Sequence, residues 1–197
     1  MAFAEFIDRV PSITLYDPLS QVLVAFEDGK ITFSYREIIK FAGHSCPTVA
    51  GAYTIARLGL SELYPDKLPV RGEVNVLLKN SETNETTGVI GAVLGAITGA
   101  AGKGGFKGLS GKFSRANRLG YEADIPGDIR LVRTDTEKAI DIKFSLNSLP
   151  QDPSLAIYFP KALVLDREAL PKFWEAWHLR VKAVLFENDR YDFISFV

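Results

Sequence analysis

The segment Phe41–Tyr53 constrains the fold of this chain most, because it joins a helix start signal to the only cysteine. Proline has a fixed φ and no N–H, so Pro47 suits the first position of a helix and makes Cys46 its N-cap. Apolar residues then recur at intervals of three or four, which predicts a helix to about Leu63 with one buried face. The members of that face are Val49, Tyr53, Ala56, Leu60 and Leu63.

An imidazole stands two residues before this cysteine, at His44. The dipole and unpaired N–H groups at a helix N-terminus favour a thiolate. The pair therefore suits a nucleophile with its base, part of a metal site, or a redox-sensitive pair, and the two residues alone do not choose among these. A cysteine that only fills space beside a histidine bonded to a carbonyl is a further interpretation. Cys46 and His44 are thus candidate catalytic residues, as nucleophile and base, and candidate metal ligands.

Three blocks of sequence carry a family resemblance. They are Gly43–Pro47 followed by Gly51, Tyr53 and Ala56; Ala96–Gly104; and Phe173–Leu185 with Trp177, Arg180 and Val181. Together they resemble the FmdE family, which is named after formylmethanofuran dehydrogenase. The resemblance implies an α+β fold, with a mixed β-sheet flanked by several helices. A length of 197 residues suits one domain, so we expect residues 1–197 to form a single FmdE-like domain.

The resemblance also implies a metal site, since some members of the family bind a metal ion near the equivalent His and Cys. His44 and Cys46 would then be ligands of a divalent transition metal, with zinc the first expectation. Zinc normally takes four ligands, or three and a water. The family's cysteine after Thr-Gly is Ala100 here, and its C-terminal cysteine-rich zinc finger cannot form in a chain with one cysteine. Carboxylates that could complete the ligand set are Glu82 and Glu85.

A glycine-rich and lysine-rich loop covers Gly99–Gly111. Glycine backbones and lysines can cradle an anion, so the loop predicts binding of an anion or a small acidic ligand. Its spacing matches neither a Walker A loop nor a dinucleotide-binding fingerprint. A flexible surface loop is the alternative interpretation. The candidate cofactor-binding residues at this loop are Thr98, Gly99, Lys103 and Gly104.

The remaining elements follow from local patterns. We expect short helices after Asp17 and Ser34, a helix over 88–99, and a last long helix opened by Pro171. Gly88, Gly91, Gly95 and Gly99 would form a smooth stripe that admits another helix, in the core or across a homodimer contact. The expected strands are Lys30–Phe33, Gly72–Lys79, Lys112–Arg118, the hairpin of Asp128–Arg133 with Ala139–Phe144, Ala156–Phe159 and the tail Tyr191–Val197.

Charge and cysteine content narrow the classes of function. A formal charge of -1 gives no general attraction to nucleic acid or to anionic membranes, so we expect neither as a partner. A single cysteine excludes an internal disulfide and points to a reducing compartment. The segment Met1–Val10 carries acidic residues and no long apolar run, which does not suit a secretory signal. We therefore expect a cytoplasmic protein.

The function expected from these observations is that of an accessory or carrier protein. It would bind a metal ion or metallocofactor through His44 and Cys46, and act with a metalloenzyme partner or as a homodimer. One alternative is a thiol-dependent enzyme with Cys46 as its nucleophile and His44 as its base. Another is a protein that binds haem through Cys46, or an anionic small ligand.

Overall fold

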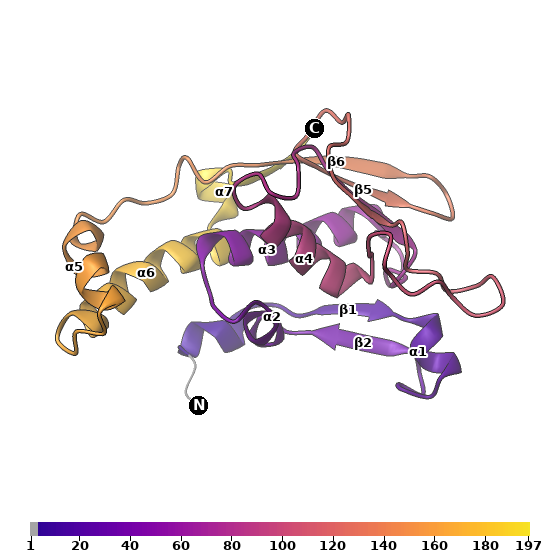
Figure 1. The fold of residues 1–197 in the computed structure, drawn as a ribbon, viewed down its shortest axis with the longest axis horizontal. Coiled ribbons are helices and arrows are strands. Elements are labelled where there is room, and N and C mark those ends of the chain that lie inside the picture. The colour runs from indigo at the N-terminus through magenta and orange to yellow at the C-terminus, as the bar shows by residue number, and fades with distance from the viewer. Residues whose placement is uncertain (1–3) are drawn as a thin grey trace.

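Helix α3 (Pro47–Leu63) lies at the centre of the computed structural model, which describes residues 4–197 (Figure 1). Thirteen of its 17 residues are buried, among them the whole apolar face predicted from the sequence. The helix approaches the main sheet closely at Gly59, where a Cβ would lie 2.8 Å from Leu131. Both ends of α3 match the prediction, because Cys46 is its N-cap, Pro47 its first residue and Leu63 its last.

The main sheet is mixed and has five strands in the order β4-β3-β5-β6-β7. Strand β3 pairs parallel with β4 and antiparallel with β5, and the other neighbours are antiparallel. The sheet confirms the predicted α+β class. Its strands are β3 (Val74–Leu78), β4 (Leu119–Gly120), β5 (Ile129–Arg133), β6 (Ala139–Phe144) and β7 (Ile194–Phe196).

A smaller layer covers the other side of α3 (Figure 1). It consists of the 3-10 helix η1 (Glu5–Arg9), the antiparallel strands β1 (Ile13–Tyr16) and β2 (Lys30–Phe33), and the helices α1 (Pro18–Val22) and α2 (Tyr35–Ala42). Helix α3 and helix α4 (Thr87–Thr98) therefore lie between two sheets of unequal size.

The glycines of α4 allow segments of this chain itself to approach the helix. A Cβ at Gly91 would collide with the hydroxyl of Tyr121, and one at Gly95 would lie 2.7 Å from the carbonyl oxygen of Ala100. The close packing foreseen for the stripe thus involves loops rather than a second helix at these two positions. These glycines therefore assign no surface to a homodimer, and the homodimer stays a prediction.

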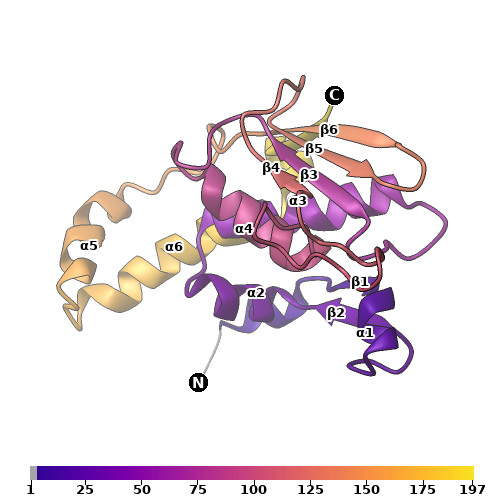
Figure 2. The ribbon, with the colours of Figure 1, turned by 45° about the vertical axis from the view of Figure 1, so that its right-hand side comes forward.

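Helices α5 (Ser154–Leu163) and α6 (Ala169–Phe186) form a hairpin that extends away from the sheets (Figures 1 and 2). The C-terminal half of α6 enters the core, where Val181 and Val184 are fully buried. A four-residue helix, α7 (Asn188–Tyr191), then leads to β7. Among residues 4–197, no helix has both the length and the apolar character needed to cross a membrane.

Two predicted strands are wrong. Lys112–Arg118 is a loop, whose first residue forms an isolated bridge with Leu109. The strand that pairs parallel with β3, β4, begins only at Leu119. Ala156–Phe159 lies within α5, because a short apolar run fits a strand and a helix equally well. Helix α6 begins two residues before Pro171. Strand β1 and η1 were not predicted. Residues 1–3 of Met1–Val10, the segment compared with a secretory signal, lie outside the part of the chain that the structure describes.

Candidate functional site

The turn Gly43–Pro47 joins α2 to α3 and carries the candidate site. Ser34 and Glu37 form a capping box that starts α2, and Gly43 ends this helix in the left-handed region with φ +77°. Cys46 then takes an extended conformation as the N-cap of α3. Local sequence signals on both sides of the turn therefore fix where His44 and Cys46 lie.

His44 is exposed, and one nitrogen of its ring has a backbone partner. Its Nδ1 lies 3.0 Å from the carbonyl oxygen of Ala42. A carbonyl oxygen can only accept, so Nδ1 is the donor, and in the neutral ring the lone pair then lies on Nε2. This arrangement fixes the tautomer, and it is the usual one for a histidine that ligates a metal through Nε2.

Cys46 is half-buried and packs against the hydrophobic core. Its Sγ accepts a hydrogen bond from the N–H of Val49 at 3.4 Å, as a side chain at an N-cap does. The thiol therefore lies at the N-terminus of a 17-residue helix, the end that carries the positive partial charge of the helix dipole. Among the described residues, no hydrogen bond joins this thiol to the imidazole of His44.

Two aromatic side chains hold the turn through Ser45, which stands between the two candidate residues. The hydroxyl of Tyr35 lies 2.9 Å from Ser45 Oγ, and Trp177 Nε1 donates to the Ser45 carbonyl oxygen at 2.9 Å. Tyr35 is fully buried, and burial raises its pKa well above the usual range, so it stays a neutral hydroxyl. Sequence reasoning named Trp177 within the block Phe173–Leu185 but did not foresee this contact. The signal that could have found it is that a buried Tyr or Trp usually needs a partner for its polar atom.

His44 and Cys46 are two candidate ligands, whereas a zinc site needs four, or three and a water. Within residues 4–197, no three His, Cys, Asp or Glu side chains are grouped so as to hold a metal ion. Glu82 and Glu85 are both exposed. The donor set of His44 and Cys46 thus fits a metal in part, and it requires further ligands from outside these side chains.

A polar cavity of about 290 Å³ lies beside the N-terminus of α4. Glu85, Thr86 and Thr87 line it from α4 and the turn before the helix, and Asp128 lines it from the turn before β5. Phe144, another lining residue, also packs against α3, since a Cβ at Gly51 would collide with its ring. The cavity therefore holds one of the two carboxylates proposed as ligands, Glu85, but it does not include His44 or Cys46.

The second candidate region packs against two arginines. Thr98 is fully buried, and its hydroxyl donates to the carbonyl oxygen of Leu94. Gly99 ends α4 with φ +76°, and a Cβ there would lie 2.5 Å from Nη1 of Arg115. Lys103 and Gly104 lie in the exposed part of the loop at residues 101–111. None of the described contacts of this region reaches His44 or Cys46, so the structure does not unite the two sequence blocks in one site.

Comparison of the chain with protein-family models, curated proteins and solved structures finds no match. The resemblance of the three sequence blocks to the FmdE family therefore stays a prediction.

Proposed function

We propose that this chain is an FmdE-like accessory protein that holds a metal ion or a metallocofactor through Nε2 of His44 and Sγ of Cys46. The observation that carries the proposal is the hydrogen bond from His44 Nδ1 to the Ala42 carbonyl oxygen. In the neutral imidazole it places the lone pair on Nε2 of an exposed side chain, two residues from a thiol at a helix N-terminus. Both atoms are therefore prepared to donate a lone pair.

The remaining ligands come from outside the chain in this proposal. Two ligands hold a metal weakly, whereas a cofactor that brings its own donor atoms, a metalloenzyme partner or a second copy can complete the coordination. A site left open in this way suits a carrier, because the cargo can leave by exchanging ligands. A divalent transition metal is the expected ion, with zinc first, because imidazole and thiolate are both ligands that zinc accepts.

Cobalt(II) titration under anaerobic conditions tests the proposal, with untagged protein so that no foreign histidines compete. We expect a thiolate-to-cobalt charge-transfer band in the wild type, its loss in Cys46→Ser, and binding at least about tenfold weaker in His44→Ala. His178→Ala is the matched control, because His178 lies on α6 in an edge contact with Phe6. A band that survives in Cys46→Ser, or that is equally weak in both histidine variants, would refute the assignment.

A thiol-dependent enzyme is the second candidate, favoured by the hydrogen bond from Val49 N–H to Cys46 Sγ. If His44 were the base, metal-free His44→Ala would show a higher apparent pKa for alkylation of Cys46 than the wild type. Because the two side chains are not hydrogen-bonded here, we expect the same alkylation profile in both proteins. A shift on removal of His44 would favour the enzyme. Binding of haem through Cys46 would instead be detected as a Soret band on titration with haem.

A further inference from the structure

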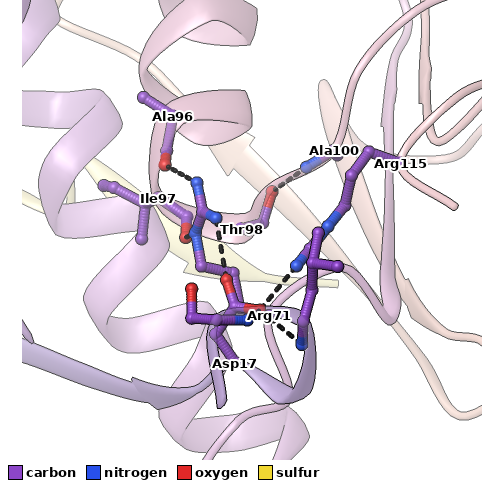
Figure 3. Close-up of polar contacts among 9 residues, drawn as sticks. Asp17, Arg71, Ala96, Ile97, Thr98, Ala100 and Arg115 are labelled. Carbon is purple, nitrogen blue, oxygen red and sulfur yellow. Dashed lines mark hydrogen bonds and ion pairs between the residues drawn. The ribbon is translucent and has the colours of Figure 1, made fainter. Parts of the chain in front are cut away.

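A buried carboxylate joins the smaller layer to the end of α4 (Figure 3). Asp17 is 1% exposed and pairs with two arginines, Arg71 at 3.0 Å and Arg115 at 2.7 Å. Arg71 continues the network, because it also donates to the carbonyl oxygens of Ala96 and Ile97 in the last turn of α4. Asp17 thus contacts two arginines, and Arg71 contacts both Asp17 and the last turn of α4.

Arg115 differs, because one of its nitrogens has no partner. The residue is 7% exposed, and Nη2 is the atom that binds Asp17. Nη1 is buried, and within the described part of the chain no atom accepts a hydrogen bond from it. A buried donor of a charged group that lacks an acceptor costs more than an ordinary unmade hydrogen bond. This nitrogen therefore calls for an acceptor from outside the protein.

A small cavity of about 40 Å³ lies beside this group. Space for one water needs roughly 10–15 Å³ on the same measure, so the cavity can take one small ion but not a nucleotide or a sugar phosphate. Two glycines make room for the guanidinium, since a Cβ at Gly72 or at Gly99 would collide with Nη1 of Arg115. The cavity is lined by Pro18, Arg71, Gly72, Glu73, Phe113, Arg115 and Arg118.

The charges around the cavity do not balance. Arg71, Arg115 and Arg118 line it together with one carboxylate, Glu73, and Asp17 adds a second negative charge through its two ion pairs. Among these described residues one positive charge is left over. The pKa of Arg115 is lowered, chiefly by burial. The like charges of Arg71 and Arg118 also lower it, whereas Asp17 raises it. An uncompensated charge in a poorly solvated site is costly unless a counter-ion is present.

We propose that a small monovalent inorganic anion, of the size of chloride, binds in this cavity against Nη1 of Arg115. Arg71 and Arg118 supply the rest of the positive field, and Gly72 and Gly99 leave the space that the Arg115 guanidinium occupies. The site is separate from the turn that carries His44 and Cys46. The sequence predicts anion binding at Lys103 and Gly104. The proposed site lies instead at arginines against which the same loop packs.

Thermal unfolding at constant ionic strength tests the site, with chloride exchanged stepwise for gluconate, which is too large for the cavity. We expect Tm to rise with chloride in the wild type and to lose that dependence in Arg115→Gln. Arg167→Gln is the matched control, because Arg167 is exposed on the loop between α5 and α6, and it should respond as the wild type does. The same Tm in both salts, or an equal chloride response in Arg115→Gln, would overturn the proposal.

A bromide-soaked crystal of the wild type gives an independent readout, which does not depend on whether Arg115→Gln folds. We expect an anomalous peak in the cavity within hydrogen-bond distance of Arg115 Nη1. A water in that position, with bromide bound only elsewhere on the surface, would show that Nη1 is satisfied by solvent and would refute the anion site.

Discussion

Replacing Asp17 by alanine is expected to lower the free energy of unfolding by about 3–5 kcal/mol, the cost of breaking a buried ion pair by removing one partner. Asp17→Ala leaves Arg115 buried without its carboxylate and takes from Arg71 one of its three acceptors. It also removes the N-cap of α1, where the carboxylate accepts from the N–H groups of Leu19 and Ser20. Urea denaturation of both proteins at pH 7 measures the difference.

Asp66→Ala is the matched control, because Asp66 is exposed in the loop before β3. A surface substitution of this kind should change stability by less than about 0.5 kcal/mol. If the two variants lost similar amounts, the network around Asp17 would not stabilise the fold as its geometry indicates.

The free energy by which Asp17 stabilises the fold should decrease as the pH is lowered. Burial alone would raise the pKa of Asp17, but the N–H of Ser20 and the guanidinium groups of Arg71 and Arg115 together bring it below its ordinary value of 3.8. A carboxyl whose pKa is lowered by folding adds stability above its unfolded pKa and loses it as pH falls through the folded value. The gap between wild type and Asp17→Ala should therefore narrow as the pH is taken below 3.8.

Gly51→Ala is expected to destabilise the protein by about 1–3 kcal/mol, although alanine is the better helix former by roughly 1 kcal/mol. Gly51 lies within α3, and a Cβ there would collide with Cζ of Phe144. The ring must move, and it lines the polar cavity beside α4, so the change affects the packing of α3 and the shape of that cavity together. Thermal and urea denaturation measure the loss.

Phe144→Leu in the same chain should recover part of that loss, because the smaller side chain makes room for the added methyl group. Gly102→Ala serves as the control, since nothing lies within 4 Å of a Cβ built there and its φ is not positive. It should leave stability unchanged or slightly higher. If Gly51→Ala and Gly102→Ala changed stability equally, the Phe144 ring would move aside without a cost in free energy.

The sequence predicts those parts of the fold that local chemistry decides. The ends of α3 follow from Pro47 and an apolar face, α2 from its capping box, and the hairpin of β5 and β6 from two alternating runs around a turn. The strand proposed at Ala156–Phe159 is wrong because its short apolar run fits a strand and a helix equally well. Asp152 and Pro153 just before the run are a helix-start signal that was not used, and the Asp152 carboxylate accepts from the N–H of Ser154.

Residues close together in the sequence could be predicted as a site, whereas contacts between residues far apart in the sequence could not. His44 and Cys46 are neighbours in one motif, so their joint position could be predicted. The contact of Trp177 with Ser45 spans 132 residues, and that of Arg115 with Asp17 spans 98. Such contacts depend on the tertiary arrangement, which no local pattern contains. The sequence also offered Glu82 and Glu85 as further ligands, but among the described residues no three His, Cys, Asp or Glu side chains are grouped so as to hold a metal ion.

The contact between Trp177 and Ser45 also sets an order of events during synthesis. Translation proceeds from the N-terminus, so the turn with His44 and Cys46 leaves the ribosome long before α6 exists. Until Trp177 has emerged and α6 has docked on α3, the Ser45 carbonyl oxygen lacks its indole partner. A nascent or truncated chain that ends before α6 therefore has both candidate ligands but not the clamp on their turn. The two candidate residues are therefore made about 132 residues of synthesis before the side chain that holds their turn in place.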